Sequence, residues 1–468
     1  MKKVYAFDVF DTCLVRKVAV PSAIFREVAV RLSLKLDATS ASFVDDFVAA
    51  RIDAEEVVRR QSKREEITLF EIWAQIKIVM GWSGHESLEQ LELDVEDEVL
   101  VAVAAVCKKV QVARQNSGRI VFISDIYLPA KFVERQLRKH GIAQPGDGFY
   151  ISSEVGMTKA SGNLFRHVLD AEGVQASQML HVGDNLHSDY SIPKGLGIVV
   201  DAFSDTCLSP GEVSLMRLNT IPAASAKVAG AMRAFRLTND QANLARVELV
   251  SQFLAPFTMG FATWVLRQAQ KDGIKRLYFL SRDCQLTWKA ACELSPHFGL
   301  IDCRYLYVSR QSLLLPSTTD ISPEGMSWIK SRWETKVLLK SLLAKIELTF
   351  DEVEMNFCML AGEARGDFCV SSENDWCEFW AALNEPELRI RIQALIAKRR
   401  DSTLTYFKSA GLFDNISWAI VDLGWYLNGQ SALWQILKSQ GWEGRIAGYY
   451  LALKCHRRPP SSAGEATA

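Results

Sequence analysis

The stretch KVYAFDVFDT, residues 3–12, decides the fold of the first part of the chain. An apolar run from Val4 to Phe7 stops abruptly at Asp8, as a buried parallel strand does when it delivers a functional loop at its carboxyl end. The same pattern returns downstream, where apolar runs end at Ser124-Asp125, Gly183-Asp184-Asn185 and Asp201. Amphipathic segments of helix length separate these runs. Residues 1–205 are therefore predicted to form an α/β domain with a mostly parallel sheet.

The segment between the first two predicted strands is far longer than the ~2–6 residues of an ordinary connection in such a domain. We predict that it forms a helical cap over about residues 15–115. Thr68 followed by Glu71 indicates a capping box at the start of one of its helices. A cap in this position closes over the edge of the sheet and excludes water from a bound molecule. Its predicted helices are 21–34, 41–60, 68–80 and 88–115.

Composition limits the class of protein and the kinds of partner. With 468 residues, of which 49% are hydrophobic and 23% charged, the chain is long enough for two or three globular domains. The 54 Lys and Arg residues nearly balance the 55 Asp and Glu residues, and no long basic run is present. We therefore expect no nucleic-acid partner.

Several features of the sequence favour a cytoplasmic protein. Its ten cysteines include no CxxC pair and no zinc-type spacing, which fits a reducing compartment. Asp8 and Asp11 interrupt the first apolar stretch, as a signal peptide would not tolerate. No run approaches the ~20 apolar residues that a membrane span needs, so we expect no span.

The second part of the chain shows a similar but weaker pattern. A polar, proline-containing stretch after Asp201 predicts a domain boundary near residue 205. We predict a second α/β domain over residues 206–454 and a disordered tail over 455–468. Its expected strands are 276–280, 305–308 and 419–421, and its expected helices are 224–236, 240–271 and a helical region over 324–410.

Two strand ends in this second domain carry polar residues. Ser281, Arg282 and Asp283 lie between a predicted strand and a helix, and Asp422 follows another strand. Such positions suit anion binding by helix-terminal amides with help from Arg. They distantly resemble the phosphate sites of Rossmann-like or phosphoribosyltransferase-like domains. The alternative is that Arg282 and Asp283 form a structural ion pair.

Four polar elements of the first domain together resemble a known superfamily. They are the loop from Asp8 to Thr12, Ser124-Asp125, Lys159, and Gly183-Asp184-Asn185 with Asp189. Their order and spacing are similar to those of the haloacid dehalogenase-like (HAD) superfamily. The motifs FDVFDT, FISDIYLP and HVGDNLHSD look like those of a bacterial branch associated with surface-polysaccharide gene clusters. The resemblance covers residues 1–205 and implies a Rossmannoid parallel sheet, a cap and phosphohydrolase activity.

The resemblance gives each residue a role in phosphoryl transfer, which needs a nucleophile and neutralisation of the phosphoryl oxygens. It implies that Asp8 attacks phosphorus to form an aspartyl-phosphate. Ser124 would donate a hydrogen bond to a phosphoryl oxygen, and Lys159 would supply positive charge. The expected substrate is a small phosphorylated metabolite, such as a sugar phosphate or a nucleotide sugar.

The resemblance also implies a Mg²⁺ site. The ion would lie between Asp8, the backbone carbonyl of Phe10 and Asp184, because a hard cation prefers oxygen ligands. Asp189 would add a ligand or orient a bound water. Magnesium is therefore the expected cofactor.

One position departs from the family pattern. Phosphatases of the superfamily usually carry a second Asp two residues after the nucleophile, and this chain has Phe10 there. Asp11 or a residue of the cap could replace this acid/base group, or the enzyme could act slowly or on substrates with good leaving groups. Three alternatives stay open: a dehalogenase, which needs no metal; a binding protein with the same fold and no turnover; and a transferase whose main reaction lies in the second domain.

Overall fold

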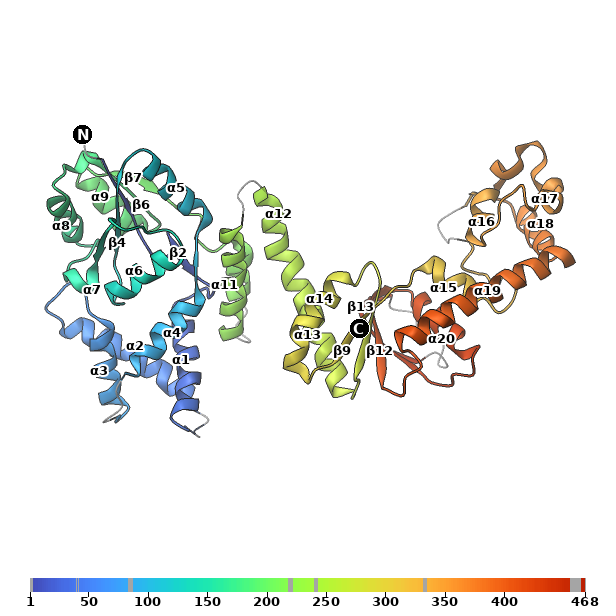
Figure 1. The fold of residues 1–468 in the computed structure, drawn as a ribbon, viewed down its shortest axis with the longest axis horizontal. Coiled ribbons are helices and arrows are strands. Elements are labelled where there is room, and N and C mark those ends of the chain that lie inside the picture. Colours follow the sequence, from blue (N-terminus) through green and yellow to red (C-terminus); the bar gives the residue numbers. More distant parts are fainter. Residues whose placement is uncertain are drawn as a thin grey trace. The chain divides into compact units, whose positions relative to one another are not determined.

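The computed structural model describes residues 3–38, 40, 42–82, 87–217, 222–239, 243–330, 335–454 and 464–467. The chain divides into two compact units, Met1–Pro256 and Phe257–Ala468. Each unit contains a five-stranded sheet in which every described strand pair is parallel. Helices flank both sheets (Figure 1). The predicted α/β fold class, with a second α/β unit after the first, is confirmed.

The first sheet has the strand order β5-β4-β1-β6-β7. Its strands are β1 (Val4–Phe7), β4 (Arg119–Ser124), β5 (Gly148–Ile151), β6 (Met179–Gly183) and β7 (Val199–Ala202). The four predicted runs form strands, and β5 is an addition. From β1 the chain moves to β4 and β5 on one side, and then returns to β6 and β7 on the other. The change of direction lies between β1 and β6, where open parallel sheets bind ligands beyond the strand ends.

Both faces of this sheet are covered, which explains the uninterrupted apolar runs. Phe7 and Phe122 belong to one buried cluster, together with residues of α5 (Ala104–Gln115) and α6 (Ala130–Lys139). Ala6 and Val121 belong to the opposite cluster, together with residues of α8 (Asn163–Glu172). Successive side chains along each strand point to opposite faces of the sheet, and they thus contribute to two hydrophobic cores, one on each face.

The insert forms a helical cap, as predicted. Its helices are α1 (Ser22–Lys35), α2 (Phe43–Gln61), α3 (Leu69–Val79) and α4 (Glu89–Val99), and they gather below the first sheet in Figure 1. The capping box of α3 is confirmed, with Thr68 Oγ1 accepting from Glu71 N at 3.3 Å.

One prediction for the insert is wrong, because the expected helix over 88–115 is interrupted. Strand β3 (Leu100–Ala102) separates α4 from α5 and pairs antiparallel with β2 (Leu14–Arg16). Its apolar residues pair with β2, on the far side of the insert in sequence, a long-range contact that local periodicity does not reveal.

Two helices beyond residue 205 pack within the first unit. They are α10 (Pro210–Met216) and α11 (Pro222–Thr238). A backbone hydrogen bond of 2.8 Å joins Ala19 N to Ala226 O. A Cβ on Gly230 would lie 2.2 Å from the Cα of Val18, so α11 approaches the chain after β2 as closely as a glycine allows. Helix α11 therefore packs directly against residues 18–19, at the start of the inserted cap.

The helical stretch Ala245–Lys271 is the one described segment long and apolar enough to cross a membrane, with a mean hydropathy of 1.4 over its most apolar window. This corrects the expectation that no segment meets that criterion. The stretch comprises α12 (Leu244–Leu249), a π-helical turn (Val250–Leu254) and α13 (Ala255–Lys271). Core helices of soluble proteins have the same length and composition, so the criterion alone does not establish a span.

The second sheet has the order β14-β13-β12-β8-β9. Its strands are β8 (Arg276–Leu280), β9 (Asp302–Leu306), β12 (Trp418–Trp425), β13 (Ile446–Leu453) and β14 (Gly464–Thr467). Strand β14 pairs with β13, so the predicted disorder of the tail is wrong for residues 464–467. The exposed edge of β13 supplies hydrogen bonds that the polar composition of the tail does not indicate. Residues 455–463 and 468 lie outside the described residues.

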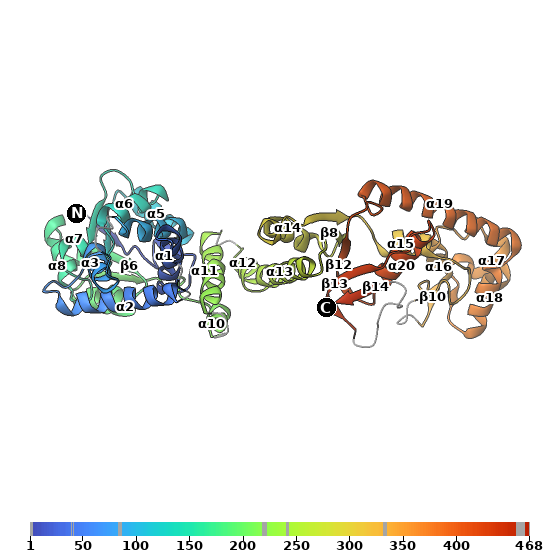
Figure 2. The ribbon, with the colours of Figure 1, turned by 90° about the horizontal axis from the view of Figure 1, so that it is seen from below.

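The predicted helical region over 324–410 has a core of its own, built around Phe357 and Phe379. It is not helical throughout, because β10 (Val337–Leu338) pairs antiparallel with β11 (Cys369–Val370). Figures 1 and 2 both show α16, α17 and α18 grouped apart from the sheet, with α19 running back toward it. Besides α13, the helices of this unit are α14 (Gln285–Leu294), α15 (Arg310–Ser317), α16 (Leu339–Lys345), α17 (Glu354–Ala361), α18 (Glu373–Leu383), α19 (Pro386–Ala410) and α20 (Asn428–Lys438).

Candidate active site

Three carboxylates converge beyond the carboxyl ends of β1 and β6. One oxygen each of Asp8, Asp184 and Asp189 lies within 4.8 Å of the other two. Asp8 N continues the strand ladder by donating to Val182 O at 2.9 Å, which fixes the start of the loop after β1. Asp189 lies in a π-helical turn, Leu186–Ser191. The sequence-predicted metal residues that bear side-chain carboxylates therefore meet in one place.

Lys159 joins this cluster from the segment before α8. Its Nζ lies 2.5 Å from Asp8 Oδ1 and 2.6 Å from Asp189 Oδ1, and all three side chains are buried. The backbone N of Lys159 donates to both carboxylate oxygens of Asp125, at 2.7 and 3.0 Å. Asp125 therefore positions the lysine. The sequence analysis noted Ser124-Asp125 at the end of an apolar run but predicted no role for Asp125. Its position directly after a strand that neighbours β1 is the feature from which a role in the site could have been predicted.

Burial and repulsion shape the electrostatics of the cluster. Burial, reinforced by Asp189 and Asp184 against the opposing Lys159, holds the pKa of Asp8 well above its ordinary value. Burial, with Asp11 and Asp189, raises the pKa of Asp184 to about 6. Burial alone would lower the pKa of Lys159, but Asp8, Asp189 and Asp125 raise it. Burial alone would also raise the pKa of Asp189, and the contacts with Lys159 and His181 lower it instead.

His181, in β6, contacts the carboxylate of Asp189. Its ring is fully buried, with Nε2 2.9 Å from Asp189 Oδ1. Burial lowers the pKa of His181, against the opposing effect of Asp189. Gly183 leaves room for the same carboxylate, because a Cβ there would lie 2.5 Å from Asp189 Cγ.

Ser124 and Thr12 complete the strand-end residues. Ser124 is buried at the end of β4, and the register that pairs Phe7 with Phe122 brings it to the same edge as Asp8. Thr12 Oγ1 donates to Asp184 Oδ1 at 3.3 Å. Thr12 thus orients one of the carboxylates that were predicted as metal ligands.

Phe10 and Asp11 each contact an arginine side chain. The guanidinium of Arg16 lies 4.7 Å from the centroid of the Phe10 ring and is paired with the buried Glu96. Asp11 has a positive φ of 55°, and its Oδ1 lies 3.2 Å from Nη1 of Arg233 in α11. Helix α11 therefore takes part in holding the loop that follows Asp8. The sequence did not predict this contact, because nothing near residue 233 marks it locally.

The cap forms hydrogen bonds with the segment that carries Lys159. Glu65 accepts hydrogen bonds from Thr158 N at 2.8 Å, Ser161 Oγ at 2.6 Å and Asn163 Nδ2 at 2.5 Å. The neighbouring Glu66 is buried and accepts from Ser152 Oγ at 3.0 Å. We call the Glu65 contacts the cap latch. Through them, the cap is hydrogen-bonded to the segment that carries Lys159.

The predicted residues of the second unit lie at the carboxyl edge of β8 and β12, but in a more open setting. Ser281 Oγ donates to Val308 O at 2.5 Å, which ties the ends of β8 and β9 together. Arg282 pairs with Asp283 at 3.5 Å, and their side chains are 88% and 58% exposed. Burial, followed by the negative charge of Asp283, raises the pKa of the partly buried Asp422. The structure thus brings Asp283 and Asp422 near each other, whereas the Arg282 side chain is solvated.

Comparison with known proteins gives a structural likeness only. No protein-family model matches the chain, and no curated protein matches it. Solved structures with a similar fold cover less than half of the chain. A HAD phosphatase from Thermococcus onnurineus is 20% identical, with 43% of this chain and 85% of that chain covered and a TM-score of 0.32.

Two further similar structures are a HAD-family enzyme from Bacteroides thetaiotaomicron in complex with magnesium and inorganic phosphate, and a 2-haloacid dehalogenase from Pseudomonas syringae pv. Tomato. The first is 14% identical, covering 43% of this chain and 94% of that chain, with a TM-score of 0.29. The second is 16% identical, covering 44% and 87%, with a TM-score of 0.34. These values are too low to say anything about activity, which must be inferred from the side chains themselves.

Proposed function

We propose that the first unit is a Mg²⁺-dependent, HAD-type phosphohydrolase acting on a small phosphorylated metabolite, such as a sugar phosphate or a nucleotide sugar. The observation that carries this proposal is the meeting of the buried Asp8, Asp189 and Lys159 with the partly buried Asp184 at the change of strand direction. Three buried charged groups and the partly buried Asp184 at the end of a parallel sheet are a costly arrangement. Burial and like charges that shift pKa values in this way are characteristic of catalytic sites.

The chain's own residues suit nucleophilic attack on phosphorus. In the proposed reaction, an Asp8 oxygen forms a bond to phosphorus while the bond from phosphorus to the substrate oxygen breaks. Lys159 neutralises charge on the phosphoryl oxygens, and its hydrogen bond to Asp8 directs it at the same point. Ser124 is proposed to donate to a phosphoryl oxygen from the end of β4. Water then releases phosphate from Asp8.

The donor set fits a divalent cation. Asp8, Asp184 and Asp189 supply oxygen atoms, and their three formal negative charges exceed the single positive charge of Lys159 by two. Hard cations such as Mg²⁺ prefer such ligands. We assign Asp8, Asp184 and Asp189, with the Phe10 carbonyl, as the residues that hold it. When bound, the ion offsets negative charge that develops on the transferring group.

Asp11 is proposed as the group that protonates the leaving oxygen. Its nearness to Asp184, whose pKa it helps to raise, favours this role. Its ion pair with Arg233 opposes the role, because the pair holds the carboxylate toward α11. Substrates whose leaving group needs little protonation are therefore expected to react fastest.

The test is phosphate release from p-nitrophenyl phosphate and from a panel of phosphorylated metabolites, measured with and without Mg²⁺. We expect turnover that requires the metal, with sugar phosphates among the substrates. The proposed setting is surface-polysaccharide biosynthesis in the cytoplasm, and the nine described cysteines are free thiols, as is usual in a reducing compartment. Complete inactivity across the panel would reject the phosphohydrolase.

A second candidate is a binding protein that keeps this fold without turnover. The packing of Phe10 beneath Arg16, at the usual position of an acid, favours it. Beryllium fluoride with Mg²⁺ separates the two candidates. A phosphohydrolase is expected to form a stable complex that blocks turnover, whereas a binding protein accepts the anion and shows no turnover to block.

A further inference from the structure

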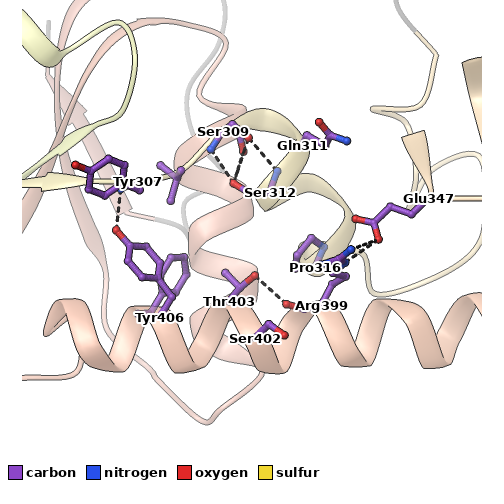
Figure 3. Close-up of a pocket in the computed structure, with 12 residues that line it drawn as sticks. Tyr307, Ser309, Gln311, Ser312, Pro316, Glu347, Arg399, Ser402, Thr403 and Tyr406 are labelled. Carbon is purple, nitrogen blue, oxygen red and sulfur yellow. Dashed lines mark hydrogen bonds and ion pairs between the residues drawn. The ribbon is translucent and has the colours of Figure 1, made fainter. Parts of the chain in front are cut away.

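We propose that a cavity in the second unit binds a neutral, hydroxyl-rich small molecule, such as an unphosphorylated sugar. The cavity has a volume of about 380 Å³ and lies beside the end of β9, between α15 and α19 (Figure 3). This volume falls in the ~300–1,000 Å³ range of small-molecule sites. The site uses no residue of the first unit, so it stands independently of the phosphohydrolase.

The walls of the cavity are fixed to one another. Tyr307 N donates to the hydroxyl of Tyr406 at 2.8 Å, which holds the chain after β9 against α19. At the other end of α15, Arg400 Nε donates to Pro316 O at 2.8 Å. Because both ends of α15 are tied to α19, the cavity is preformed. A ligand therefore binds without the entropic penalty of ordering its walls.

The charge of the lining excludes an ionic ligand. Glu347 and Arg399 are the charged residues among those that line the cavity, and Arg399 Nη2 lies 2.6 Å from Glu347 Oε2. Their charges cancel, so no surplus positive charge remains for a phosphate or a carboxylate. Anion sites in proteins depend on such a surplus. A neutral polar ligand is the class that this lining fits.

The hydrogen-bonding groups of the lining include both acceptors and donors. The hydroxyls of Ser402 and Thr403 donate to backbone carbonyls of α19 at 3.0 and 2.9 Å, so their oxygens face a ligand as acceptors. The guanidinium of Arg399 provides donors. A sugar hydroxyl both donates and accepts, and it can therefore satisfy both kinds of group.

Figure 3 shows the two sides of this arrangement. Ser309, the N-cap residue of α15, and Ser312 in α15 face the cavity from one side, Ser402 and Thr403 face it from α19, and the Glu347–Arg399 pair closes one end. The Tyr406 ring lies at the opposite end, near Tyr307, whose side chain is 71% exposed. Aromatic rings give an apolar surface for the C–H face of a sugar ring, beside the polar groups that orient it.

The test is saturation-transfer NMR on the full-length protein, with glucose, galactose, mannose and N-acetylglucosamine at millimolar concentration. We expect at least one sugar to receive saturation, and inorganic phosphate not to displace it. Arg399→Ala should weaken the binding of that sugar about tenfold, because it removes a charged hydrogen-bond donor. Thr403→Val should weaken it about fivefold.

Thr405→Val is the matched control. Thr405 lies on the same helix and makes the same hydroxyl-to-carbonyl bond, to Asp401 O at 2.9 Å, but it does not line the cavity. We expect its affinity to equal that of the wild type. The proposal is overturned if no sugar receives saturation, if phosphate displaces the bound sugar, or if Thr403→Val and Thr405→Val have equal effects.

Discussion

In the first sheet, Asp8 follows β1 and Asp184 follows its neighbour β6; in the second, Asp283 lies just beyond β8 and Asp422 lies in its neighbour β12. Both pairs belong to neighbouring parallel strands at which the chain changes direction. The first strand of each sheet is flanked on one side by the next sheet strand along the chain and on the other by a later strand. By topology alone, the two edges are equivalent places for a ligand.

Their burial differs sharply. The side chains of Asp8 and Lys159 are 5% and 3% exposed, whereas those of Arg282 and Asp283 are 88% and 58% exposed. Charges without solvent interact strongly and must be paired, while solvated charges are screened. The first edge has an inserted helical cap that contacts the segment carrying Lys159. The order of the strands therefore determines where a site can form. The burial of its charged side chains determines how strongly they interact with one another.

Replacing one acidic residue at each edge tests this contrast most directly. Asp8→Asn should abolish Mg²⁺-dependent phosphate release, a loss of at least about a thousandfold, because the amide cannot serve as nucleophile. Asp422→Asn should leave release of phosphate unchanged. Steady-state assays with p-nitrophenyl phosphate measure both variants. Retained turnover in Asp8→Asn would remove Asp8 from the mechanism, and a loss in Asp422→Asn would bring the second unit into the reaction.

Burial should also make two ion pairs of the cap differ in their contribution to stability. Arg51 and Glu92 are almost fully buried and 2.8 Å apart, and Trp73 Nε1 donates to the same carboxylate at 2.9 Å. Arg51→Met leaves Glu92 charged without its partner and should lower the free energy of unfolding by about 3–5 kcal/mol. Arg31→Met breaks the solvent-exposed pair with Glu98 and should lower it by about 0–1 kcal/mol. Urea denaturation measures both, and equal losses would contradict the role of burial.

The core of the site was predictable because it depends on strand ends. An apolar run that stops at Asp8, and another that stops before Asp184, place two carboxylates at one edge as soon as the strands are neighbours. The order of the runs brings Asp8 and Asp184 together, and the resemblance implied that Lys159 and Asp189 join them. In the structure all four side chains meet at that point. The chemical roles of these residues remain proposals.

The supporting contacts could not be predicted, since they join segments far apart in sequence. Arg233 contacts Asp11 from a helix that was assigned to a different domain. The polar residues of β14 become a strand only because β13 leaves an edge to pair with. Local composition carries no information about such partners, so the predicted helix through Leu100 and the predicted disorder of residues 464–467 were both incorrect.

The glycine at the end of β6 tests how tightly the first site is packed. In Gly183→Ala, the new Cβ would lie 2.5 Å from Cγ of Asp189, so the carboxylate must move. We expect a loss of about 1–3 kcal/mol in stability and weaker Mg²⁺ binding by calorimetry. Gly195→Ala is the control, because no atom lies within 4 Å of the position that its new Cβ would take. Mg²⁺ affinity that is unchanged in Gly183→Ala would show that Asp189 does not need its present position.

The cap latch should have the smallest effect, because it acts on the site indirectly. Glu65→Gln keeps the size of the side chain but removes the charge that Ser161, Thr158 and Asn163 hydrogen-bond. A loosened Lys159 segment should lower kcat about tenfold, since small misplacements of a catalytic group slow the reaction steeply. Glu56→Gln, an exposed change in α2, should leave kcat unaltered. If kcat stays at the wild-type value in Glu65→Gln while the first sheet remains folded, the cap covers the site without helping to position Lys159.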